Sequence, residues 1–135
     1  MSSSVTADSA SEFIARFLGF DDAVIRRIVL ELTRSTARRR AVIDVMARDL
    51  RSNEEWVMCS IEVLGLAEYL IQEGPKGSYQ VLSDGLKLAW HGRLVFLDFG
   101  TSDEPNIEEI RSGGFFFAGN DVRYTVRPPD KTDLL

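Results

Sequence analysis

The feature that most constrains the fold of this chain is the turn signal GPKG at residues 74–77. Its two glycines tolerate positive φ angles, and its proline presets the φ angle of a tight turn. The runs on either side, AEYLIQ and SYQVL, have the length of β-strands. We therefore predict that the chain doubles back between Leu70 and Leu82 as a β-hairpin.

Upstream of this turn, apolar residues recur at spacings of three and four, a pattern typical of amphipathic helices. The pattern predicts four helices: one that ends near Gly19, one that opens at Asp21 or Asp22, one that is capped by Ser35 and Thr36, and one over residues 53–64. A continuous helix over residues 22–50 is the alternative, but the polar run TRSTARRR favours a break.

Downstream of the turn the expected elements are shorter. The sequence predicts a short helix in GLKLAWHG, a buried strand in RLVFLDF, a helix in SDEPNIEEIRSGG and a second hairpin in FFFAGNDVRYTV. In the last hairpin, Val122, Tyr124 and Val126 are expected on one side. The chain is thus predicted to be helical first and mostly β afterwards.

The length of 135 residues suits one domain with its own core. We predict mobile tails at residues 1–11 and 128–135 and a single domain over residues 12–127. No apolar run approaches the roughly 20 residues that span a bilayer, and the N-terminus does not resemble a signal peptide. The expectation is therefore a cytoplasmic protein without membrane contact, and the single cysteine fits a reducing compartment.

Three short helices followed by a hairpin resemble a winged helix-turn-helix domain. The resemblance covers about residues 21–90 and depends on the pattern VLGLAEYLIQEGPKGSYQVLSDGLKLA. It implies an α+β fold, with a helical N-terminal part, a β-hairpin wing and a C-terminal β-rich extension. It also implies that residues 53–64 enter the DNA major groove and that the wing contacts the backbone.

The distribution of charge supports this first hypothesis, a DNA-binding regulator. Residues 21–51 hold eight arginines and five acidic residues, whereas residues 52–135 hold seven basic and fourteen acidic residues. Clustered cations attract phosphates, so the residues expected to contact double-stranded DNA are Arg34, Arg38, Arg39, Arg40 and Lys76. The alternative is that these arginines pair with acidic residues of the chain or hold a partner.

A second hypothesis is a protein-interaction module or a small subunit of a larger complex. It is favoured by the low isoelectric point and by the acidic residues on the segment expected in the groove, because these oppose DNA phosphates. Phe116 should face away from its two phenylalanine neighbours and reach an interface. The predicted partner-binding residues are Glu54, Glu55, Glu62 and Phe116. Under the first hypothesis, a homodimer through the N-terminal helix or the C-terminal hairpin would double the contact with DNA.

Catalysis is not expected, because the sequence contains no phosphate-binding loop, no H-E-x-x-H, no C-x-x-C and no G-x-S-x-G. We predict no catalytic residues, no metal site and no cofactor. Cys59 is interpreted as a packing residue or a passive thiol. Trp56 and Trp90 are interpreted as core residues, and His91 as a surface or capping residue.

Overall fold

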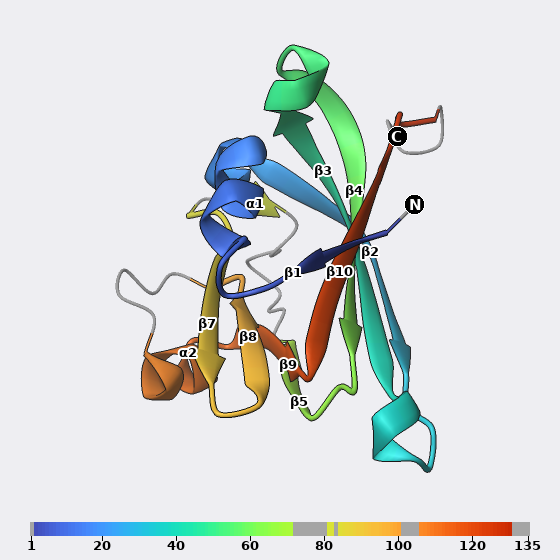
Figure 1. Cartoon of the computed structure of the whole chain (residues 1–135), viewed down its shortest axis with the longest axis vertical. Helices are drawn as coiled ribbons and strands as arrows, with labels where there is room; N and C mark the ends of the chain where they lie inside the picture. Colours follow the sequence, from blue (N-terminus) through green and yellow to red (C-terminus); the bar gives the residue numbers. More distant parts are fainter. Residues whose placement is uncertain (1, 72–80, 83, 101–105, 131–135) are drawn as a thin grey trace, which may run out of the picture.

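Two antiparallel β-sheets face each other in this protein (Figure 1). The structure is a computed structural model that describes residues 2–71, 81–82, 84–100 and 106–130. The large sheet has the strand order β1-β10-β4-β3-β2-β6, and the small sheet has the order β5-β9-β8-β7. The large sheet is built from β1 (Ser3–Val5), β2 (Ala23–Glu31), β3 (Arg40–Asp49), β4 (Glu55–Leu64), β6 (Val81–Leu82) and β10 (Asp121–Arg127).

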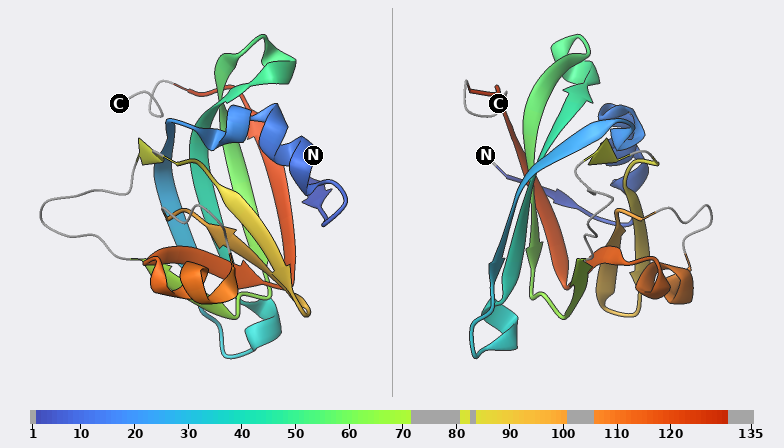
Figure 2. Two further views of the ribbon diagram at one scale, coloured as in Figure 1. Left: turned by 90° about the vertical axis from the view of Figure 1, so that its left-hand side faces the viewer. Right: turned by 180° about the vertical axis from the view of Figure 1, so that it is seen from behind.

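The small sheet is built from β5 (Glu68–Ile71), β7 (Lys87–His91), β8 (Leu94–Asp98) and β9 (Phe115–Gly119). The helical elements are α1 (Ala10–Arg16), α2 (Ile107–Ser112) and the 3-10 turns η1 (Leu18–Phe20), η2 (Thr36–Arg38) and η3 (Leu50–Ser52). The right view of Figure 2 shows the small sheet against the lower part of the large sheet, and α1 with η1 against its upper part. The inner face of the large sheet is therefore covered along its length.

The two sheets are joined at a corner, where β4 continues into β5 and β9 continues into β10. The backbone N–H of Asn120 donates to the carbonyl of Leu64 at 2.8 Å, which holds the two crossing segments together. A Cβ atom on Gly119 would lie 2.6 Å from that same carbonyl oxygen. This glycine therefore allows the close approach of the two backbones on which the corner depends.

We expect Gly119→Ala to destabilise the protein by about 2 kcal/mol, because the methyl group would collide with backbone that cannot move freely. Urea unfolding measures this change in the free energy of unfolding. The matched control is Gly92→Asn, because Gly92 has a φ of 61° and open space around it, and asparagine tolerates that φ. Equal, small effects of the two substitutions would contradict the close approach at the corner.

The core lies between the sheets and under α1. Alternate residues of β3 and β4 point inward, among them Ile43, Val45, Ile61 and Val63, which are fully buried. At the upper end, the rings of Phe13, Phe17, Phe20 and Tyr124 pack together with centroid distances of 4.6–5.9 Å. A second, smaller cluster lies between α2 and the outer face of the small sheet and contains Phe96, Ile110, Phe116 and Ala118.

The helices predicted between residues 21 and 64 are wrong, because these residues form the strands β2, β3 and β4. They are rich in valine and isoleucine, whose branched Cβ atoms favour strands. A β-bulge between Ile25 and Arg27 also interrupts the alternation of β2. The two core-facing residues on either side of the bulge, Ile25 and Ile28, are therefore three positions apart. This spacing imitated a helical stripe.

The resemblance to a winged helix is wrong as well, because the two strands of the expected wing do not pair with each other. Strand β5 pairs with β9, and β6 pairs with β2 in the other sheet. Residues 74–77 lie outside the described residues. The fold class predicted from the resemblance, α+β with a helical N-terminal part, is therefore replaced by two antiparallel sheets with few helices.

Other elements differ in part from the expectation. The predicted helix in GLKLAWHG is strand β7, and β9 and β10 are strands that pair with other partners instead of with each other. The predicted tail over residues 1–11 contains β1, which pairs with β10, and the start of α1. The strand in RLVFLDF is confirmed as β8, and the inward side of β10 holds Val122 and Tyr124 as predicted.

Candidate partner-binding surface

The outer face of the large sheet carries cross-strand rows of side chains that point away from the core. The strand register places Val81, Val24, Met46 and Met58 in one row, with Arg127 at its end. This row lies toward the η3 end of the sheet, which is the upper end in Figure 1. The outer face of an antiparallel sheet is usually polar, so a row of four apolar side chains stands out.

Polar side chains neutralise each other in the other half of this face, toward the β2–β3 connection. Arg40 forms ion pairs with Glu31 and Glu62, at 2.8 and 2.7 Å. Arg123 pairs with Asp121 at 3.1 Å. In this half of the face Arg40 and Arg123 therefore have carboxylate partners.

An apolar hollow of about 310 Å³ opens beside the middle of the apolar row. Its lining residues are Val24, Arg26, Met46 and Trp56. The guanidinium of Arg48 lies 5.3 Å from the centre of the Trp56 ring, a cation–π distance that orders both side chains. We call these five residues the Trp56 surface. Because Trp56 is 38 % exposed and Met46 is buried at 7 %, the tryptophan forms a wall and the methionine the floor.

A second hollow of about 370 Å³ lies on the other side of Trp56. Trp56 belongs to the lining of both hollows and therefore separates them. The second hollow is more polar, and its lining includes Arg16, Asp49, Glu55 and Arg127.

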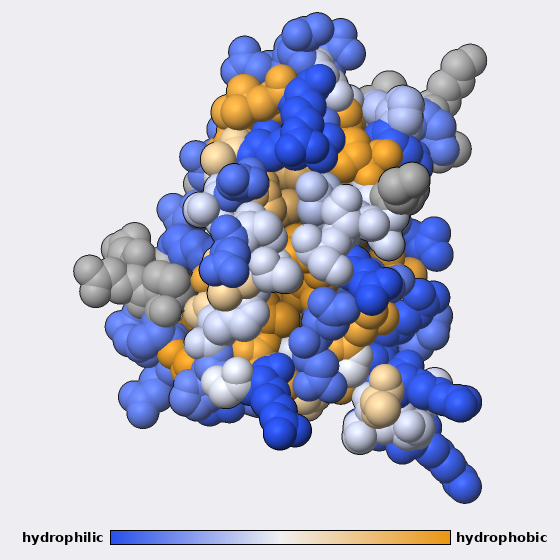
Figure 3. Space-filling view, in the orientation of Figure 1, coloured by the Kyte–Doolittle hydropathy of each residue, from blue (hydrophilic) through white to orange (hydrophobic). Residues whose placement is uncertain are grey.

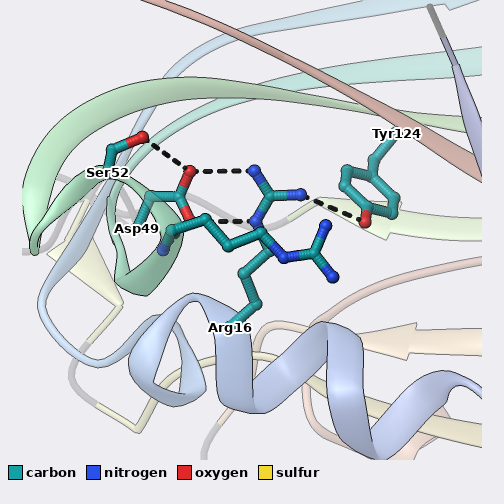
Figure 4. Close-up of polar contacts among 5 residues, drawn as sticks. Arg16, Asp49, Ser52 and Tyr124 are labelled. Carbon is teal, nitrogen blue, oxygen red and sulfur yellow. Dashed lines mark hydrogen bonds and ion pairs between the residues drawn. The ribbon is translucent and has the colours of Figure 1, made fainter.

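A buried ion pair, shown in Figure 4, forms part of this second hollow. Arg16, at the end of α1, donates from Nε and Nη2 to the two carboxylate oxygens of Asp49, at 2.8 and 2.9 Å. The same carboxylate accepts from the Ser52 hydroxyl and from the Arg51 backbone N–H. Arg16 also donates to the Tyr124 hydroxyl at 3.4 Å.

The side chain of Asp49 is 0 % exposed, so its charge depends on these donors. The Arg16 guanidinium holds the pKa of Asp49 below its usual range, and the donors of Arg51 and Ser52 act in the same direction, whereas burial opposes them. The donors come from α1 and η3, and the acceptor comes from the end of β3. The ion pair therefore fixes α1 and the η3 connection to the upper end of the large sheet.

The arginines predicted to contact phosphates lie at the β2–β3 connection, the lower end in Figure 1. Arg34 and Arg38 are exposed there, whereas Arg39 is half-buried and donates from Nε to the carbonyl of Thr33. Figure 3 shows hydrophilic side chains that project from this lower right end. Arg40 is instead held by its two ion pairs, and Lys76 lies outside the described residues. The structure thus brings three of the five predicted cations together.

The predicted partner-binding residues lie apart from one another. Glu62 is paired with Arg40 in the lower half of the outer face, whereas Glu54 and Glu55 are exposed near the η3 end. Phe116 does face away from its neighbours, but α2 covers it and it is 4 % exposed. These four residues do not form one surface.

The sequence interpretation missed Val24, Met46 and Trp56 as surface residues. Trp56 and Trp90 were expected in the core, but they are 38 % and 37 % exposed. The sequence of β4 does contain a pattern that indicates the exposed side of Trp56. Its apolar residues Val57, Cys59, Ile61 and Val63 recur at every second position and alternate with the residues of the outer face. Recognition of this period of two would have placed Trp56 on the opposite face from the core.

The remaining candidate groups are the thiol of Cys59 and possible metal ligands. Cys59 is buried in the core, and burial raises the pKa of its thiol, so the reactive thiolate is disfavoured. Within the described ranges, no group of three or more histidine, cysteine, aspartate or glutamate side chains is arranged to hold a metal ion. A search of the same ranges for membrane-spanning helices finds no helix of sufficient length and hydrophobicity.

Comparison of the chain with models of protein families, with curated proteins and with solved structures finds no match.

Proposed function

We propose that this protein is a binding module that docks a partner protein on the Trp56 surface. The observation that supports this proposal is the exposed Trp56 beside an apolar hollow on the outer face of the large sheet. In the apolar row Met46 and Met58 are only 7 % and 0 % exposed, so the apolar area in contact with water comes mainly from Val81 and the neighbouring Trp56, at 53 % and 38 %. Exposed apolar area of this kind is costly to leave in contact with water. A partner that covered it would remove that cost.

The residue types of the Trp56 surface match those that dominate protein interfaces. Tryptophan, arginine and methionine are enriched at interfaces, and tryptophan and arginine supply many of the residues with the largest effects on binding. The exposed apolar area continues beyond the hollow, because Val81 lies next to Val24 in the register and is 53 % exposed.

Quantitative co-purification tests the proposal. The tagged full chain is compared with Trp56→Ala and with Trp90→Ala, which removes a tryptophan of matched exposure from β7 in the other sheet. We expect Trp56→Ala to weaken capture of a specific partner by about 2 kcal/mol or more, close to thirtyfold in affinity. Trp90→Ala should leave capture unchanged.

Thermal unfolding of each variant shows whether it has retained its fold. A partner that is held equally by the wild type and the folded Trp56→Ala variant would show that the Trp56 surface is not the docking site.

A second candidate function, contact with nucleic-acid phosphates, is favoured by the arginines at the β2–β3 connection. Arg34 and Arg38 are exposed and Arg39 is half-buried within residues 32–39, a segment that contains no acidic residue. Such a cluster attracts the phosphate backbone without regard to sequence. In this second candidate function, DNA phosphates bind at the β2–β3 connection, and no recognition helix is required.

A salt titration with duplex DNA tests this second candidate. We expect weak binding at low salt whose logarithmic salt slope falls by about 2–3 when Arg34, Arg38 and Arg39 are changed to alanine, since each phosphate contact adds about 0.9. The control changes Arg51, Lys87 and Arg93 to alanine, three cations that form no ion pair among the described residues. The second candidate is rejected if both triple variants bind alike or if the wild type does not bind at low salt.

A further inference from the structure

We propose that the partner presents an acidic segment, with one aromatic or branched apolar side chain inserted in the hollow and a carboxylate beside Arg48. This inference rests on the proposed function, because it specifies the chemistry of the segment that the Trp56 surface accepts.

The hollow requires an apolar anchor. Its floor and walls are contributed by Val24, Met46 and Trp56, and the one charged side chain in its described lining is Arg26. A volume of about 310 Å³ is at the small end of the range for binding pockets, which suits a single large side chain. Burial of an aromatic or branched side chain there would contribute on the order of tenfold to hundredfold in affinity.

The charges around the hollow specify the flanking residues of the segment. Arg48 forms no ion pair with any residue in the described part of the chain, and no carboxylate of that part lines the hollow. The nearest acid along the outward side of β3 is Asp44, which accepts a hydrogen bond of 2.6 Å from Ser60. In the lower half of the same face, by contrast, Arg40 and Arg123 have carboxylate partners.

The position of Arg48 prepares it to bind a carboxylate. Its guanidinium lies over the Trp56 ring, so part of its conformational entropy has already been lost before a partner binds. An arginine that stacks on an aromatic face still presents N–H donors at its edge, and these match the two oxygens of a carboxylate. A glutamate or aspartate next to the anchor would therefore form an ion pair with Arg48.

A second copy of this chain fits the surface less well. Face-to-face association through the Trp56 surface would bring two copies of Arg48 together, and like charges in contact oppose association. Charge complementarity thus favours an acidic segment of another protein.

The test selects random 12-residue peptides displayed on phage against the immobilised full chain, with Trp56→Ala used to remove peptides that bind elsewhere. Selected peptides are then synthesised, and their Kd values are measured with the wild type, Trp56→Ala, Arg48→Gln and Arg123→Gln. The last variant is the matched control, because Arg123 is an arginine of the same face that is paired with Asp121.

We expect peptides in which aspartate or glutamate flanks an aromatic or branched apolar residue. Trp56→Ala should weaken their binding about thirtyfold, Arg48→Gln about tenfold with a smaller salt dependence, and Arg123→Gln less than about twofold. If Trp56→Ala does not fold, Arg48→Gln still tests the inference, because Arg48 is exposed.

Selected peptides that depend on Trp56 but lack acidic residues, or that bind Arg48→Gln as well as the wild type, would overturn the inference and leave the proposed function intact. A selection that yields no Trp56-dependent peptide would also overturn it. The proposed function is judged separately, by the co-purification of the natural partner.

Discussion

Replacement of Asp49 by asparagine should destabilise this protein by about 3 kcal/mol or more. The substitution leaves the guanidinium of Arg16 without its counter-charge, and that side chain is 16 % exposed. Removal of one member of a buried ion pair typically costs about 3–5 kcal/mol, because the remaining charge stays desolvated. Urea unfolding at neutral pH measures the change.

Two further variants make this test specific. Asp121→Asn removes an acid from an exposed ion pair and should change the free energy of unfolding by less than about 1 kcal/mol. Arg16→Met combined with Asp49→Asn should cost less than the sum of the two single changes, because the double variant contains no unpaired charge. Additive losses would show that Arg16 and Asp49 do not act as a pair.

The effect of Asp49→Asn should also depend on pH. Because the pKa of Asp49 is lower in the folded state than in the unfolded state, its stabilisation is fully present above the unfolded value. It is lost as the pH falls below about 4 and through the lower folded pKa. The stability difference between the wild type and Asp49→Asn should therefore decrease in acid, and a difference that stayed constant down to pH 2 would contradict the assignment.

Phe17→Ala should have an effect of similar size, about 3–5 kcal/mol, because it empties the aromatic cluster under α1. Phe17 is 1 % exposed, and its ring lies 5.0–5.9 Å from those of Phe13, Phe20 and Tyr124. The centre of the Phe17 ring is also 5.0 Å from the Arg16 guanidinium. Removal of the ring would therefore take away a side chain that packs against the arginine of the Arg16–Asp49 ion pair. Urea unfolding again gives the value.

The control for Phe17→Ala is Leu32→Ala, since Leu32 is 51 % exposed at the β2–β3 connection and should change stability by less than about 0.5 kcal/mol. A loss below about 1 kcal/mol for Phe17→Ala would mean that α1 and η1 do not close the upper end of the core.

The C-terminal strands were more predictable than the N-terminal half. The apolar run of β8 and the alternation in β10 have a period of two and were recognised as strands. In β2 the bulge after Ile25 breaks that period, and in β3 the outward Val42 and Met46 add apolar residues at helical spacings. The choice between helix and strand then depends on contacts between distant segments, which local spacing does not contain.

The candidate surface was harder to predict than the fold, because its residues come from three strands. Val24, Met46 and Trp56 are far apart in the sequence, and the register of β2, β3 and β4 brings them together. Once β4 had been interpreted as a helix, Trp56 was placed beside the core. The arginines at the β2–β3 connection lie in one short segment, so their proximity follows from the sequence alone, whereas the ion pairs of Arg40 depend on the strand register.

Site-specific photo-crosslinking tests the central claim, that a partner protein covers the Trp56 surface, most directly. A benzophenone amino acid replaces Trp56 in one full-length variant and Trp90 in another, and both are irradiated in the cells that express them. We predict a discrete crosslinked product between the chain and a partner from position 56, and none of that mass from position 90. The same product from both positions, or a product from position 90 alone, would contradict the claim.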